Sequence, residues 1–122
     1  MPRMTAKTIE DLAVWRKAHE FVLGVYWFTT SFPKHEGYGL TIQIRRGAMS
    51  IPANMAGGCK KRDESDKARF MNITQVSIEE CRYYLLLAKD SGEGGTGVLM
   101  NALEQVNRLL EAYTKSILAS GS

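Results

Sequence analysis

The sequence predicts an all-α protein that folds as an up-down antiparallel four-helix bundle. Three observations predict it: four long segments place apolar residues at helical spacing, three short stretches rich in helix breakers separate them, and no extended run alternates in the manner of a strand. A chain of 122 residues suits one domain with its own core. We expect a flexible N-terminal segment at 1–8, the bundle over 9–119 and a frayed tail at 120–122.

The first two helices are bounded and shaped by prolines. The first is expected from about Ile9 to Thr30 and to end in the stretch 31–34, since the residue before Pro33 is pushed away from the α region. The second is expected from about Leu40 to Lys61 with Pro52 inside it. Because an internal proline removes a backbone hydrogen bond, either this helix kinks or two helices meet there, and a kinked single helix is our prediction. We expect the side chain of Asn54 to satisfy the carbonyl that Pro52 leaves unpaired.

The last two helices have clear start signals. The third is expected over about 66–89, with Asp63 or Ser65 as its N-cap. Residues 91–97 form the clearest loop. The final helix then carries a nearly perfect apolar seam along one face. The members of that seam are Leu99, Leu103, Val106, Leu110, Tyr113 and Ile117.

The first and third helices carry more apolar surface than one bundle needs. A helix of about 20 residues in an isolated bundle requires a single apolar face. We interpret the surplus, which includes Phe21, Trp27, Phe28 and Tyr83, as a second interface between subunits. A thick core with a few exposed aromatic side chains is the alternative.

No group of residues predicts catalysis, so we expect a protein that is not an enzyme and that uses no cofactor or metal. His19 and His35 have no carboxylate or cysteine at a spacing typical of a metal site or triad. Cys59 and Cys81 form no CxxC pair and are interpreted as small buried residues, although neighbouring cations would lower the pKa of an exposed Cys59 thiol. The G-x-G-x-x-G pattern over 92–97 follows a helix rather than a strand, which indicates a helix–helix loop.

Glu79 and Glu80 resemble a carboxylate pair. Adjacent helix residues point about 100° apart, so the two side chains cannot share a proton or a metal unaided. We interpret them as a charged helix face, with Glu80 partly buried beside Ser77 and Cys81.

The chain carries no signal for export or for a membrane. Its first residues are polar, and the longest apolar stretch, 21–28, falls far short of the roughly 18 to 20 residues that span a bilayer. We therefore expect a cytoplasmic protein without a membrane partner.

Basic residues concentrate in the first half of the chain. Residues 1–62 carry ten Lys/Arg and four Asp/Glu, a formal charge of +6, whereas residues 63–122 carry six and nine, a charge of −3. Lys60, Lys61 and Arg62 suit the C-terminus of a helix, where cations are stabilised by the helix dipole. Arg45 and Arg46 lie inside a helix, where adjacent guanidinium groups suit phosphate or carboxylate partners. We predict that these five residues contact nucleic acid; salt bridges between subunits are the alternative.

Two segments resemble a known family. Residues 9–18 (IEDLAVWRKA) resemble its opening, and residues 38–56 (YGLTIQIRRGAMSIPANMA) resemble its hallmark. The family is the set of four-helix-bundle proteins encoded in 23S rRNA intervening sequences, also called S23 ribosomal proteins, which are related to the accessory variability determinant of diversity-generating retroelements. The resemblance covers about 9–89, and the last helix only by its pattern.

The resemblance implies an up-down bundle that assembles as a ring, commonly a homopentamer, with no defined biochemical role. The retroelement relatives bind nucleic acid and a reverse transcriptase through basic surfaces, so the resemblance also implies RNA or a nucleic-acid-processing protein as a partner. This chain departs from the family at Gly57, where relatives usually have glutamate. If that glutamate pairs with an arginine in the relatives, Arg45 or Arg46 lacks that partner here.

Overall fold

The computed structural model describes residues 12–32, 37–59 and 63–121. Within them the chain forms four α-helices and one short π-helix, so the predicted all-α class is confirmed. The predicted N-terminal segment at 1–8 and the cations at 60–62 lie outside the described residues.

Helix α1 spans Ala13–Thr29. Its buried side chains recur at intervals of three and four residues and include Val14, Ala18 and Val25, as the apolar pattern predicts. Phe21 belongs to this buried face with 1% of its surface exposed, so its assignment to a subunit interface is wrong. Phe28 is half-buried and packs edge-on against Phe32, with ring centroids 4.9 Å apart.

Helix α3 spans Ile42–Cys59 and follows the π-helix η2, Gly37–Thr41. Pro52 lies inside one continuous helix, as predicted, and does not divide it in two. The amide of Asn54 donates to the carbonyl of Ser50 at 2.8 Å. Pro52 has no N–H to donate to the carbonyl of Ala48, which is the carbonyl that we expected Asn54 to satisfy. Asn54 bonds instead to the carbonyl of Ser50, about half a turn further along the helix.

Helix α4 spans Glu64–Asp90, and Asp63 is its N-cap because its carboxylate accepts from the Ser65 amide at 3.0 Å. After α4 the chain turns at Gly92, where φ is +96°, a left-handed conformation that glycine adopts without a steric penalty. The G-x-G-x-x-G pattern therefore lies in a helix–helix turn and in the start of the next helix. Helix α5 spans Thr96–Gly121 and extends into the tail predicted at 120–122.

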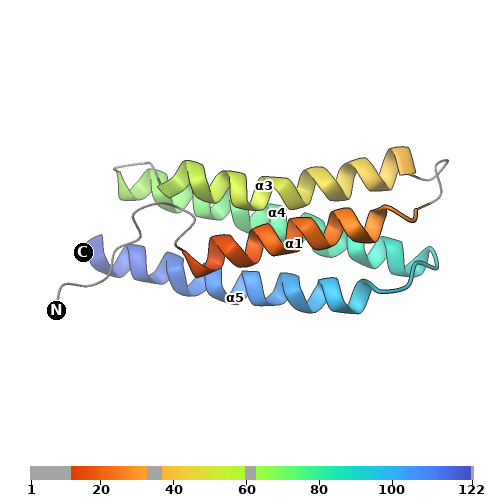
Figure 1. The fold of residues 1–122 in the computed structure, drawn as a ribbon. Helices are drawn as coiled ribbons and strands as arrows, with labels where there is room; N and C mark the ends of the chain where they lie inside the picture. The colour runs from red at the N-terminus through yellow and green to blue at the C-terminus, as the bar shows by residue number, and fades with distance from the viewer. Residues whose placement is uncertain (1–11, 33–36, 60–62, 122) are drawn as a thin grey trace.

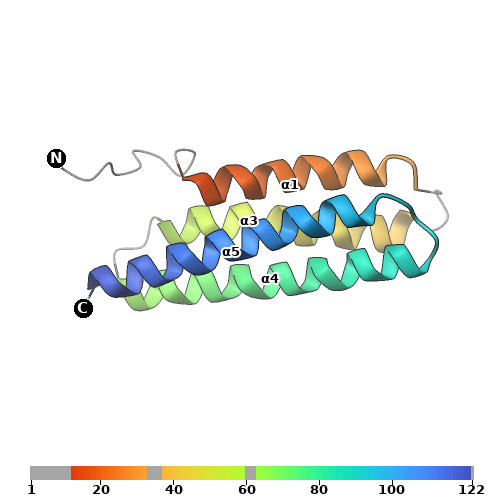
Figure 2. The same ribbon diagram turned by 90° about the horizontal axis from the view of Figure 1, so that it is seen from below.

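The four helices run antiparallel along one long axis (Figure 1). Helix α1 packs against α3 and α5, and α4 packs against the other sides of α3 and α5, as the bundle seen from below shows (Figure 2). Each helix thus has two neighbours and one outward face.

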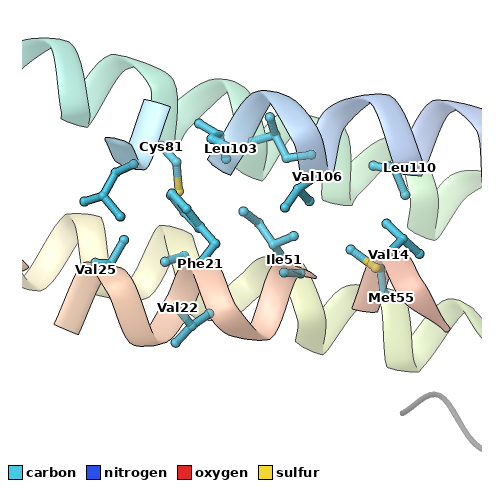
Figure 3. Close-up of a cluster of buried hydrophobic side chains, with 14 of the residues drawn as sticks. Val14, Phe21, Val22, Val25, Ile51, Met55, Cys81, Leu103, Val106 and Leu110 are labelled. Carbon is cyan, nitrogen blue, oxygen red and sulfur yellow. The ribbon is translucent and has the colours of Figure 1, made fainter. Parts of the chain in front are cut away.

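The core lies between all four helices, and each contributes side chains that point inward (Figure 3). The predicted seam of α5 is confirmed at Leu99, Leu103, Val106 and Leu110. On α4, Thr74 is fully buried although the apolar pattern passed over it, because its hydroxyl donates to the Phe70 carbonyl at 2.8 Å.

Helices α3 and α4 approach closely through small residues. A Cβ at Gly47 would lie 3.1 Å from the Cys81 Sγ, and one at Gly58 would lie 2.6 Å from the end of Met71. Ser50 and Ser77 hydrogen-bond across the same contact at 2.6 Å. At Gly57, a Cβ would lie 3.2 Å from the Phe70 ring. Glycine at position 57 therefore leaves room for the Phe70 ring where α3 and α4 pack together.

Candidate interface around Arg45 and Arg46

Arg45 is held in place by helix α1. Its Nε donates to the Thr29 hydroxyl at 2.8 Å, and its guanidinium carbon lies 4.5 Å from the centre of the Tyr26 ring. Thr29 is 3% exposed, and its hydroxyl donates in turn to the Val25 carbonyl at 2.8 Å. One buried hydroxyl therefore accepts from Arg45 while it donates to a carbonyl of its own helix, which fixes the guanidinium against the seam between α1 and α3.

The outer edge of this guanidinium makes no contact with an acid. Arg45 is partly buried, and within the described residues its two Nη atoms have no hydrogen-bond partner and no carboxylate at ion-pair distance. The Tyr26 hydroxyl is itself occupied, because it donates to the sulfur of Met49 at 3.3 Å. Arg45 thus presents the four N–H donors of its two Nη atoms and a positive charge without a counter-ion in the described residues.

Arg46 points elsewhere. It is exposed and has no ion pair in the described part of the chain. Since successive helix residues diverge by about 100°, the two arginines do not form one patch with parallel side chains. The structure therefore separates two residues that the sequence placed together, and Lys60, Lys61 and Arg62 lie outside the described residues.

Arg46 belongs to a row of exposed residues that we name the α3 outer stripe: Ile42, Arg46, Met49 and Ala53. A second row, the α4 outer stripe, runs along α4. It consists of Ile73, Val76, Glu80, Tyr83 and Leu87. Both rows recur at alternating intervals of three and four residues, the spacing by which helices pair in coiled coils, yet both face away from the core.

Two of the predicted interface aromatics are exposed. Trp27 is 81% exposed on α1, beside Leu23 and Thr30, with which it lines a shallow hollow. Tyr83 is 59% exposed within the α4 outer stripe. Both positions agree with the surplus apolar surface that the sequence indicates.

The other candidate residues occupy structural positions. His19 is exposed and stacks on Trp15, with ring centroids 5.3 Å apart, while His35 lies outside the described residues. Burial beside Gly47 raises the pKa of the Cys81 thiol to about 12, with a smaller contribution from the negative charge of Glu80, so this thiol is inert at neutral pH. The structure does not describe the side chain of Cys59.

The two carboxylates of α4 differ. Glu79 pairs with Arg82, whose Nε also donates to Glu104 on α5 at 2.8 Å, so this acid belongs to a network that joins two helices. The same two carboxylates raise the pKa of the Arg82 guanidinium. Glu80 is exposed rather than partly buried, which corrects our expectation. It makes no ion pair within the described residues.

Sequence reasoning missed the anchor of Arg45. Nothing in the spacing of α1 marked Thr29 as its partner, because the contact joins residues sixteen apart on two helices. The α4 outer stripe was readable in principle, since its apolar members already stand at coiled-coil spacing.

Two kinds of site are not found over residues 12–32, 37–59 and 63–121. No three His, Cys, Asp or Glu side chains there gather as a metal would require. No helix in the same ranges has the length and apolar character needed to cross a membrane.

Comparison with known proteins gives the family. The sequence profile of the 23S rRNA-intervening sequence proteins matches residues 10–115, which extends the resemblance from residue 89 into α5. A crystal structure of a protein of unknown function from the S23 ribosomal protein family of Bacteroides thetaiotaomicron VPI-5482 has the same fold, with a TM-score of 0.77 and 21% identity, over 84% of this chain and 99% of that one. No curated protein matches the sequence. The chain therefore belongs to the 23S rRNA-intervening sequence protein family.

Proposed function

We propose that this protein is a cytoplasmic, non-enzymatic homo-oligomer that presents basic side chains to RNA or to a ribonucleoprotein. The observation that carries the RNA contact is Arg45, a partly buried guanidinium that Thr29 and Tyr26 hold in one orientation with its outer edge unpaired in the described part of the chain. A fixed fork of N–H donors loses little conformational entropy when it binds a phosphate.

Assembly strengthens the proposed contact. One Arg45 neutralises one phosphate, which alone gives weak binding at physiological salt. A homo-oligomer repeats Arg45 in every copy, together with Lys60, Lys61 and Arg62 as predicted from the sequence. The number of phosphate contacts then rises with the number of subunits.

Filter binding to single-stranded and hairpin RNA at several salt concentrations tests the proposal. Arg45→Ala is expected to weaken binding to every RNA and to reduce the slope of log K against log salt by about one contact per subunit. The matched control is Arg108→Ala, an exposed arginine on the outer face of α5. Equal binding by wild type and Arg45→Ala, with both variants folded by circular dichroism, contradicts the proposal.

A second candidate is a structural or protein-adaptor ring that has no nucleic-acid role and whose arginines tie subunits together. The two outer stripes favour it, because each places a single charge between apolar residues. This candidate predicts that the assembled protein purifies without a 260 nm absorbance excess and retains no RNA at low salt. It also predicts that replacing Arg45 and Arg46 together gives single chains.

A further inference from the structure

The two outer stripes share one layout with opposite charge. On α3, Arg46 lies between Ile42, four residues before it, and Met49, three residues after it. On α4, Glu80 lies between Val76 and Tyr83 at the same two intervals. All these side chains are exposed.

Each stripe lacks what the other supplies. The large apolar members stay exposed by 40% or more, although the Met49 sulfur accepts a hydrogen bond from Tyr26 on α1. Neither Arg46 nor Glu80 has an ion-pair partner in the described residues. Apolar residues at coiled-coil spacing bind a second helix, and one charged residue among them selects the partner and fixes the register. The stripes thus match in the spacing of their apolar residues and are opposite in charge.

We propose that the α3 outer stripe of one copy packs against the α4 outer stripe of a second copy, with Arg46 opposite Glu80. This inference rests on the self-association contained in the proposed function and names the faces that make it. Each charge has an apolar neighbour four residues before it and another three residues after it, so Arg46 can meet Glu80 whether the two helices run parallel or antiparallel. Reversing one helix displaces the flanking apolar residues by only about 1.5 Å, the rise of one residue.

The contact is heterologous, because it joins two different faces. Every copy has one α3 outer stripe and one α4 outer stripe, so each copy binds two others. A closed ring, which the family resemblance implies, results when the rotation from copy to copy returns to the first one. Arg46 is used in this contact, whereas Arg45, fixed at the α1–α3 seam, stays available for a phosphate. The two neighbouring arginines therefore serve two purposes.

Charge reversal with mixing tests the pairing. The variants are Arg46→Glu and Glu80→Arg, and the control is Arg108→Glu on the outer face of α5. Sedimentation velocity measures the assembly of each protein, and circular dichroism confirms its helix content. Each single reversal places like charges against each other, so we expect the association constant to fall at least about tenfold, whereas the control assembles like wild type.

An equimolar mixture of the two weakened variants is the decisive sample. When they alternate, the glutamate introduced by Arg46→Glu in one variant meets the arginine introduced by Glu80→Arg in the other, and the wild-type pair meets at the next contact. An even-numbered ring then closes with every contact matched, whereas a five-membered ring keeps one contact between like charges. Assembly of the mixture is therefore expected to exceed that of either variant alone by at least about tenfold. A salt bridge within one chain gives no such recovery, because both partners would have to change in the same molecule.

Three results overturn the pairing, and they are distinguishable from a failure of the proposed function. If wild type assembles and the charge-reversal variants assemble equally well, the subunits meet through other faces. Weakened variants that do not complement each other show that the charges act within a chain. An Arg46→Glu protein that assembles normally but loses RNA binding assigns Arg46 to phosphate. Wild type that sediments as a single chain instead contradicts self-association itself.

Discussion

Helices α4 and α5 are alike inside the bundle and unlike outside it. They have 27 and 26 residues and lie side by side, and each buries an apolar stripe against the other helices. Five large apolar side chains are exposed on α4, whereas among the described side chains of α5 only Val98 is. The outer face of α5 is otherwise polar or small, with residues such as Asn101, Gln105 and Arg108.

This difference separates the requirements of folding from those of assembly. One bundle needs one apolar face on each helix, and α5 meets that requirement with little surplus. Helix α4 carries a second face at coiled-coil spacing whose apolar side chains remain 40–59% exposed in the single chain. We infer that the outer face of α4 contacts another molecule and that the outer face of α5 faces water.

The inner faces should respond equally to cavity formation. Leu85 on α4 and Leu103 on α5 are both fully buried, so Leu85→Ala and Leu103→Ala are each expected to lower the free energy of unfolding by about 2–5 kcal/mol. Denaturant titration at one protein concentration measures both. Val98→Ala is the control and should change this free energy by less than about 0.5 kcal/mol. A large loss for one leucine alone would show that the two helices do not share one core.

The outer faces should respond unequally to a charge. Val76 and Val98 are the same residue type, exposed by 59% and 76% on α4 and α5. Val76→Glu is expected to weaken association by about 2 kcal/mol at each contact, as at the centre of an interface, whereas Val98→Glu leaves it unchanged. Light scattering after size exclusion compares the two. Equal behaviour of the two variants would remove the distinction between these faces.

The approach of α4 to α3 is closer than space for a methyl group allows. Gly58→Ala places a Cβ 2.6 Å from Met71 Cε and 2.9 Å from Phe70 Cβ, so we expect a loss of stability of about 1–2 kcal/mol. Gly97→Ala on α5 meets open space and should instead stabilise by up to about 1 kcal/mol through helix propensity. Thermal unfolding followed by circular dichroism measures the change in stability of both variants. A Gly58→Ala protein more stable than wild type would contradict the close packing.

The buried thiol of Cys81 on α4 makes the stability of the fold depend on pH. Its pKa is raised to about 12 because burial disfavours the thiolate, so the folded state keeps a proton that the unfolded chain releases above its ordinary value of 9.0. Stability from this group is complete below pH 9 and falls as pH rises toward 12, by about 1 kcal/mol at pH 10. Unfolding of Cys59→Ser and of Cys59→Ser/Cys81→Ala at pH 8 and pH 10 isolates the effect. Equal pH slopes for the two proteins would rule it out.

The fold was predictable because its signals are local. Apolar spacing located all four helices, and the carboxylate type of Asp63 marked the start of α4. Helix ends were less certain: α1 begins at Ala13 and not near Ile9, and α5 continues to Gly121. Such ends depend on capping contacts that periodicity does not contain.

The candidate interface was predictable only in part because it depends on contacts between helices. Sequence adjacency grouped Arg45 with Arg46, but the Thr29 hydroxyl on another helix fixes one and leaves the other exposed. The same limit explains Phe21, whose apolar character suited core and interface equally. Which of two apolar faces turns inward follows from how the helices pack, and a single helix does not specify it.

Sedimentation velocity of the wild-type protein, from low to high micromolar concentration, tests the account most directly. If the outer stripes of α3 and α4 bind copies of the chain, the protein sediments as a particle several times the mass of one chain, and Val76→Glu shifts it toward single chains. A wild-type protein that sediments as one chain throughout this range would contradict the claim that these faces join subunits.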